Sequence, residues 1–293
     1  MKVRKIFVLI CVVALMCSLV SCNKEVESEE IFILTGSNGV DGDRESFKGL
    51  IRDGNDYGLY MLSNKVKDSE VDKIKNIKGS KEGEYQYEYS KVYTKKLDSG
   101  KVERIFDIYY KRGSDNGEEK IIEECTYLRG TEFICTYISS QENVGIYKGE
   151  GDTRSIAEEY LVKILSKERF EEYTHTETRE NALSGGEILY RYTRFIEGYK
   201  TDDEITVYVN DEGYIKAYRI WEYGKYDTLK NTLTKEQLDK TKEKLDAKIA
   251  EVFAGQDIQL RDLLVITDPE AKPYLEITIV EDTCAYALAT PIE

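Results

Sequence analysis

The sequence predicts an α+β protein in which an antiparallel β-meander precedes two units, each of one helix followed by three strands, with the helices packed on antiparallel sheets. Residues 84–140 contain four segments of alternating or continuous apolar character, separated by short turn sequences. Residues 152–165 change to helical spacing, and residues 234–253 carry a helix start signal and an apolar stripe. Because each helix has one apolar face, it suits one face of a sheet.

The chain begins with a short targeting segment. Lys2, Arg4 and Lys5 precede an uncharged run, residues 6–20, which is shorter than the roughly 20 residues that a spanning helix needs. A basic start, a short apolar core and small residues at its end are typical of a secretory signal peptide.

Residues 19–22, Leu-Val-Ser-Cys, resemble the lipobox of bacterial lipoproteins. In that family the cysteine is acylated and the preceding peptide is removed. The resemblance implies that residues 1–21 are a lipoprotein signal peptide and that Cys22 becomes the lipidated N-terminus of an extracytoplasmic protein held at the cell membrane. An ordinary secretory signal or an uncleaved anchor is the alternative.

Charge restricts the partners of this protein. Removing residues 1–21 takes away three basic residues and changes the formal charge from −14 to −17. Nucleic acids and anionic surfaces are bound through clustered Lys and Arg, so we expect no nucleic-acid partner and expect lipid to provide the membrane contact.

The division of the chain follows the change of pattern. Residues 22–30, the lipidated cysteine and "NKEVESEE", have little to bury and should be a flexible tether. Residues 31–150 should form a mostly β N-terminal domain, although residues 31–83 are rich in loop signals and hold only a short candidate helix near 69–78. Residues 151–293 should form the α+β domain of two helix-plus-three-strand units.

Two cysteines lie in the last hairpin of the meander. Cys125 and Cys135 flank a turn at Arg129-Gly130, and a three-residue loop would place them opposite each other. A cross-strand disulfide is one interpretation, and two reduced, buried cysteines are the other. Cys284 has no partner in either interpretation.

The two helices have clear boundaries. Asp152 or Thr153 supplies the first N-cap, and the stripe that follows is Ile156, Ala157, Tyr160, Leu161, Ile164 and Leu165. Thr234 and Gln237 form a capping box for the second helix, Leu233 can pack on Leu238, and Gly255 is a natural stop. The expected strands are residues 187–196, 204–210 and 214–223 after the first helix, and 261–267, 273–281 and 284–290 after the second.

Residues 152–223 resemble PepSY and peptidase-propeptide domains of secreted and envelope proteins. The leading helix, the strand-turn-strand "FIEGYKTDDEITVYV" and the closing "NDEGYIKAY" carry the resemblance, over about a quarter of the chain. It implies a folding aid or an inhibitor. No protease domain accompanies it, so that role is not carried over directly.

No pattern predicts catalysis, a metal or a cofactor. His175 is the only histidine, lies in a polar segment without a nucleophile motif, and is expected in an exposed loop. Multi-histidine zinc sites are thereby excluded. Asp41, Asp43 and Glu45, and a second stretch from Asp53 to Asn64, resemble EF-hand starts but lack the closing Glu, so turns explain them better. "TDDE" and "NDEG" lie at opposite ends of one expected strand, roughly 25 Å apart.

Tyrosine is abundant, with 23 residues. Tyr85, Tyr87 and Tyr89 are expected on one strand face, where they would stack on a ligand or pack across strands. Trp221 is expected in the core. The leading hypothesis is a non-catalytic envelope lipoprotein that binds a protein partner, with an inhibitory or regulatory role. A lipoprotein that binds a small molecule or glycan is second, and a hydrolase is third.

Overall fold

The computed structural model describes residues 31–36, 47, 49–50, 61–66, 85–97, 100–115, 118–131, 134–183, 186–220, 224–229, 231–267 and 272–293. Several expectations fall outside these residues and stay predictions. They concern the signal peptide, Cys22, the tether, the helix near 69–78, Trp221, and nearly all of the two EF-hand-like stretches.

The described elements are predominantly strands. In chain order they are β1 (Ile33–Gly36), β2 (Met61–Val66), β3 (Gln86–Leu97), β4 (Gly100–Asp115), β5 (Glu118–Leu128), β6 (Ile134–Ser139), α2 (Thr153–Leu165), α3 (Lys167–Phe170), β7 (Tyr173–Arg179), β8 (Ile188–Ile196), β9 (Tyr199–Val209), β10 (Ile215–Ile220), α4 (Lys235–Val252), β11 (Gln259–Thr267), β12 (Pro273–Glu281) and β13 (Cys284–Pro291).

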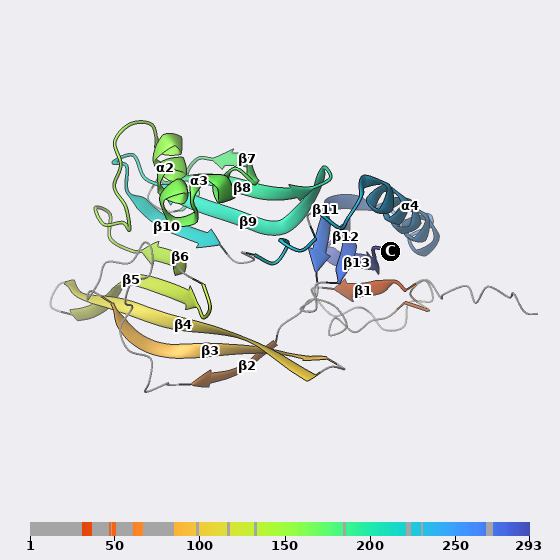
Figure 1. Cartoon of the computed structure of the whole chain (residues 1–293), viewed down its shortest axis with the longest axis horizontal. Coiled ribbons are helices and arrows are strands. Elements are labelled where there is room, and N and C mark those ends of the chain that lie inside the picture. Colours follow the sequence, from red (N-terminus) through yellow and green to blue (C-terminus); the bar gives the residue numbers. More distant parts are fainter. Residues whose placement is uncertain are drawn as a thin grey trace, which may run out of the picture.

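These strands form one mixed sheet in the order β1-β13-β12-β11-β9-β10-β6-β5-β4-β3-β2, with β8 and then β7 on the other edge of β9 (Figure 1). The expectation of purely antiparallel sheets is wrong at one place. Strand β11 pairs with β9 in parallel, through Leu264 opposite Lys200 and Val265 opposite Thr201. The crossover through α4 brings β11 back alongside β9 in the same direction, and this short parallel contact joins the two helix-covered units.

The meander is present as expected. Strands β3, β4, β5 and β6 pair consecutively and antiparallel, and β6 then pairs with β10. The turn signals in the sequence correctly mark the ends of these strands, because short loops join antiparallel neighbours directly.

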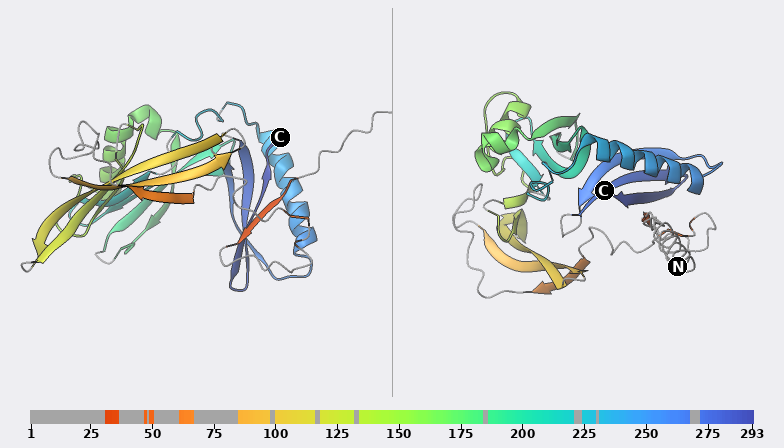
Figure 2. Two further views of the ribbon diagram at one scale, coloured as in Figure 1. Left: turned by 90° about the horizontal axis from the view of Figure 1, so that it is seen from below. Right: turned by 45° about the vertical axis from the view of Figure 1, so that its right-hand side comes forward.

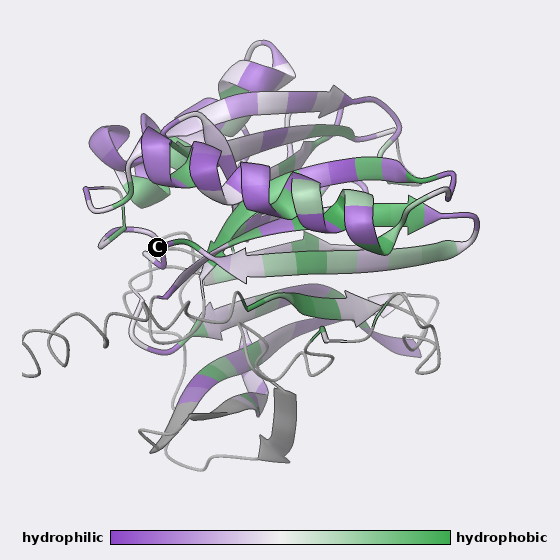
Figure 3. Cartoon of the chain, turned by 90° about the vertical axis from the view of Figure 1, so that its right-hand side faces the viewer, coloured by the Kyte–Doolittle hydropathy of each residue, from purple (hydrophilic) through white to green (hydrophobic). Residues whose placement is uncertain are grey.

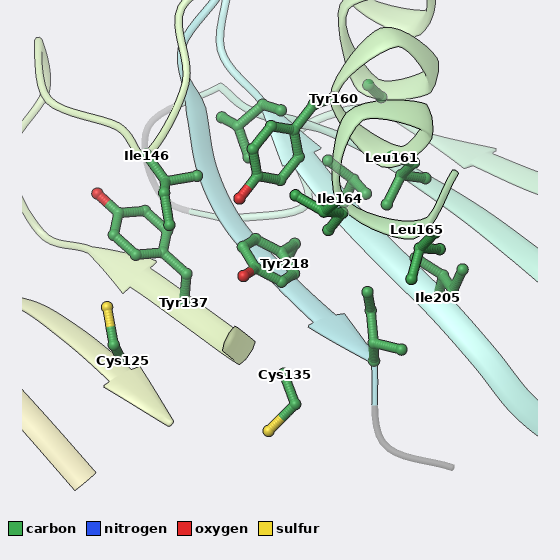
Figure 4. Packing of buried hydrophobic residues seen from close by; sticks show 14 of the residues in the cluster. Cys125, Cys135, Tyr137, Ile146, Tyr160, Leu161, Ile164, Leu165, Ile205 and Tyr218 are labelled. Carbon is green, nitrogen blue, oxygen red and sulfur yellow. The ribbon is translucent and has the colours of Figure 1, made fainter. Parts of the chain in front are cut away.

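Helix α2 covers the face of β8, β9 and β10. The Asp152 side chain caps it by accepting from the Ser155 amide, and the six stripe residues expected from the sequence are all buried. Figure 4 shows Tyr160, Leu161, Ile164 and Leu165 pointing from the helix toward Ile205 and Tyr218 of the sheet. These residues belong to a hydrophobic cluster that continues into β4, β5 and β6.

The first unit contains four strands after its helix instead of three. The additional strand, β7, includes His175, which the sequence analysis placed in an exposed loop. Threonine alternates along "YTHTETR", and β-branched residues suit a strand that lies at the sheet edge with few apolar neighbours. Because this segment is polar, it has no apolar alternation by which its sequence would predict a strand.

Helix α4 begins as expected, with both hydrogen bonds of the Thr234–Gln237 capping box present. It packs on β12 and β13, and Leu233 and Leu238 are buried in the same cluster. Figure 3 shows hydrophilic residues on its outer side and hydrophobic residues in the strands beneath it. The helix ends at Val252, three residues before Gly255, which has a positive φ of 76° and is the stop that the sequence indicates.

The beginning of the described chain lies beside its end. Strand β1 pairs antiparallel with β13, with Ile33 opposite Ala289 and Gly36 opposite Tyr286. Figure 2 shows β1 beside the blue strands, apart from β3 and β4. Residues 33–36, which the sequence assigns to the N-terminal domain 31–150, therefore extend the sheet under α4.

Candidate functional site

The face of the sheet opposite α2 carries a groove. It has a volume of about 380 Å³ and is lined from four neighbouring strands by Thr136, Tyr137, Ile138, Arg191, Asp202, Glu204, Thr206, Tyr208, Ala217, Tyr218 and Arg219. Along β9 the groove residues alternate with Asp203, Ile205 and Val207, which are buried on the other side. The groove is thus the second face of the strands that α2 covers.

Strand register aligns the polar groove residues. Arg191 lies opposite Thr206, Thr206 opposite Arg219, and Arg219 opposite Thr136, so one row crosses β8, β9, β10 and β6. At the outer end of this row, in β7, Glu177 pairs with Arg191 through Nη1 and Oε2 at 3.1 Å. Two guanidinium groups separated by one strand therefore lie on the same face.

The groove's carboxylates are neutralised by cations of the same chain. Glu204 accepts from the ammonium of Lys200 at 2.9 Å and lies 3.7 Å from Arg191. Asp202 pairs with Lys225 at 3.0 Å and accepts from the Tyr226 hydroxyl. Arg191 takes part in these ion pairs, through Glu177 and Glu204, so the arginine row crosses the groove beside paired carboxylates.

An exposed apolar side chain adjoins the arginine row. Ile138 of β6 is 46% exposed, although it lies in the interior of the sheet between β5 and β10. Ala217 lies opposite both Ile138 and Tyr208, so a small residue separates two larger ones and deepens the groove. The surface combines apolar contact with charged donors, which is the usual composition of a binding site.

The three tyrosines of the predicted row pack in or against the protein interior, and their proposed role in ligand stacking stays a prediction. The hydroxyl of Tyr85 donates to Glu123 at 2.9 Å and its ring is buried, and a register shift interrupts the strand between Tyr87 and Tyr89. All three rings pack in or against the main hydrophobic cluster. Tyr87 also makes an edge contact with Tyr109, at 5.7 Å between ring centroids. Cross-strand packing, the alternative interpretation, describes them.

The buried carboxylate of Glu123 is held by two tyrosines and a lysine. Glu123 accepts from Tyr137 at 2.6 Å and from Tyr85, and its other oxygen lies 3.1 Å from the ammonium of Lys111. Burial disfavours its ionisation, but the donors of Tyr137, Tyr85 and Lys111 outweigh burial and lower the pKa of Glu123. Burial, together with this negative charge, raises the pKa of Tyr85 and of Tyr137. The group joins β4, β5 and β6 to Tyr85, the residue that precedes β3.

Cys125 and Cys135 do not face each other. Cys125 lies opposite Tyr137, because the hairpin carries a register shift and a longer connection than the expected three-residue loop. Both are free, buried thiols, and Figure 4 shows their side chains apart. Burial raises the pKa of Cys125, and raises that of Cys135 to about 11. The interpretation as two buried hydrophobic cysteines describes them.

Other candidate chemistry is not assembled within the ranges that the structure describes. His175 bonds to the Thr178 hydroxyl at 3.0 Å and contacts the ring of Tyr192. No group of three or more His, Cys, Asp or Glu side chains there has the arrangement of a metal site. Among these same residues, no helix has both the length and the apolar character needed to cross a membrane.

Sequence reasoning did not identify the groove residues. The segment "TDDEITVYV" does indicate a polar face, because polar residues alternate with apolar ones and define a second, solvent-exposed side of the strand. The sequence does not show that Arg191, Arg219 and Thr136 lie in one cross-strand row on this face. Register between strands that are distant in the chain depends on tertiary pairing.

No family model matches the sequence, and no curated protein matches it. A distant structural neighbour is the Bacillus megaterium YpeB C-terminal domain, with a TM-score of 0.32 and 11% sequence identity, covering 72% of this chain and 86% of that one.

Proposed function

We propose that this protein is an extracytoplasmic, membrane-anchored lipoprotein that has no catalytic role and binds a protein partner of the cell envelope in the groove. The signal-like residues 1–21 and the lipobox at residues 19–22 support the anchor. An inhibitory or regulatory effect on the partner is the role that the PepSY-like resemblance of residues 152–223 suggests, and it belongs to this proposal.

The observation that carries the binding proposal is the arginine row beside Ile138. Arg191 and Arg219 are set by strand register, and Ile138 is exposed within the sheet. Arginine is favoured at interfaces because its planar group binds carboxylates with two hydrogen bonds and packs on apolar surface. A partner segment that carries a carboxylate beside an apolar side chain fits this surface.

Site-specific crosslinking in intact cells tests the proposal. A photoreactive residue is placed at Ile138 in the full-length protein, and the same residue at Lys240, on the outer side of α4, is the matched control. We expect one recurrent envelope protein to be crosslinked from position 138 and not from position 240. Arg219→Ala should reduce that product roughly tenfold, since an interface arginine typically contributes about 1–3 kcal/mol.

The Cys22→Ala form separates anchoring from binding. Lipid labelling and signal-peptide removal should be lost in this form, and continued labelling would contradict the lipobox prediction. Equal crosslinking from positions 138 and 240 would contradict the groove as the binding site. Absence of any crosslinked protein would favour the second candidate, a small ligand, for which a 380 Å³ groove is large enough.

A further inference from the structure

The carboxylate of Asp203 lies on the opposite side of β9 from the groove and is completely buried. The Tyr173 hydroxyl of β7 is 3.0 Å from each of its oxygens, and Nη1 of Arg194 in β8 is 3.6 Å away. The arginine contact is longer than a hydrogen bond, so the tyrosine is the only close donor that the structure shows for this carboxylate among the described side chains.

Arg194 is buried and directs its guanidinium group mainly at two other carboxylates. Its Nη1 donates to Asp227 at 2.8 Å, and its Nη2 lies 2.9 Å from Glu172. Arg169 of α3 contacts the same two acids, at 2.6 Å to Asp227 and 3.0 Å to Glu172. Nη1 of Arg194 therefore lies 2.8 Å from Asp227 and 3.6 Å from Asp203, distances that favour Asp227.

Asp227 belongs to the segment 224–229, which leads from β10 toward α4 and which we call the connecting segment. Lys225 and Tyr226 of this segment contact Asp202, whose side chain lines the groove. The Tyr226 hydroxyl also lies 3.0 Å from the Val265 carbonyl of β11. The connecting segment thus holds both sides of β9 at the place where β9 meets β11.

The charges around Asp203 balance only when it is neutral. Arg169 and Arg194 provide two positive charges against Glu172, Asp227 and, when ionised, Asp203. Asp202, the next residue of β9, adds repulsion. Burial raises the pKa of Asp203 to about 7, and the Tyr173 hydrogen bond, Arg194 and Arg169 only partly oppose that shift.

We propose that the connecting segment is a proton-controlled latch whose switch is the carboxyl group of Asp203. When Asp203 carries its proton, Arg194 keeps its hydrogen bond to Asp227. This bond holds the connecting segment against β8 and α3. When the proton leaves, the new negative charge draws Nη1 of Arg194 away from Asp227. The segment then loosens, and with it the Lys225 and Tyr226 contacts at the groove rim.

The direction of the pH effect follows from these charges. The folded protein binds a proton at Asp203 up to about pH 7, whereas an unfolded aspartate releases it near 3.8. The folded state therefore holds more protons across this window, and the contribution of Asp203 to stability falls as pH rises through it. The latch is closed below about pH 7 and opens above it.

Hydrogen exchange of the lipid-free protein, without any partner, tests the latch separately from the proposed binding function. Protection factors of residues 224–229, corrected for intrinsic exchange, are measured from pH 5.5 to 8.5. We expect protection to fall roughly tenfold, with a midpoint near pH 7. Asp203→Asn, which imitates the protonated form, should keep high protection throughout, and Glu243→Gln on the exposed side of α4 should behave as the unmodified protein.

Tyr173→Phe supplies a second, independent result. Loss of a hydrogen bond that favours the ionised carboxylate raises the pKa of Asp203, so the midpoint should move to higher pH. A purely structural role of the cluster would lower protection without moving the midpoint. Protection that does not vary with pH, or that falls equally in Asp203→Asn, would overturn the proposal.

Discussion

Two buried carboxylates in this protein ionise differently because their donors differ. Glu123 has two tyrosine hydroxyls and an ammonium group within 3.1 Å, and its pKa is lowered. Asp203 has one tyrosine hydroxyl at hydrogen-bond distance and an arginine at 3.6 Å, and its pKa is raised to about 7. Burial penalises both charges, so the number of close donors decides which form is stable.

The cysteines provide the prediction at this scale. Thiol labelling of the folded chain, expressed without residues 1–22, should modify Cys284 and leave Cys125 and Cys135 unmodified, because buried thiols with raised pKa values are poor nucleophiles. Mass spectrometry gives the count. In denaturant without reductant all three should react, and a single modification there would indicate a disulfide between Cys125 and Cys135.

At the scale of elements, local sequence signals place the helices correctly. The capping side chains of Asp152 and Thr234 accept from backbone amides that the first helical turn leaves without partners. At the β9–β10 turn, Gly213 has a φ of +81° and approaches the Gly149 carbonyl so closely that a Cβ would lie 2.6 Å from it. The two caps depend on residues within one helical turn and can be identified from the chain alone, whereas the approach of Gly213 to Gly149 is a tertiary contact.

Thr234→Ala should reduce the free energy of unfolding by about 1 kcal/mol, because it removes the capping box of α4. Urea denaturation followed by circular dichroism measures the loss. Thr234→Ser retains the hydroxyl and should recover most of the stability. If serine and alanine destabilise the protein equally, the cap is not the cause.

At the scale of the whole molecule, one mixed sheet connects units that the sequence presents separately. The β9–β11 contact contains only two residue pairs, and β1 joins β13 across most of the length of the chain. The two largest hydrophobic clusters lie under α2 and under α4, on either side of this contact. The connecting segment contacts both β9 and β11 beside this junction, through Tyr226.

A substitution at Leu34 tests how much β1, the strand added at the edge beside β13, stabilises the protein. The side chain of Leu34 is fully buried in the cluster under α4, so Leu34→Ala should lower the free energy of unfolding by about 2–5 kcal/mol. Thr35→Ala, one residue further on the other face of β1, is the control and should cost under about 1 kcal/mol. Equal effects in chemical denaturation would show that β1 contributes little to this core.

The sequence alone determined the meander of β3 to β6, both helices with their caps and buried stripes, and five of the seven strands in the two units with nearly correct bounds. It also supports the lipobox prediction at Cys22, which lies outside the described residues. These features depend on periodicity and on caps within a few residues, so local chemistry is sufficient to specify them.

Only the tertiary structure decided which strands meet. The parallel β9–β11 contact, the polar edge strand β7, the register that separates Cys125 from Cys135, and the level row of Arg191 and Arg219 all depend on pairing between segments distant in the chain. A shift of one residue would turn these side chains to the other face, and nothing local prevents it. The buried environment of Asp203 arises in the same way, because α3, β7, β8 and the connecting segment supply its neighbours.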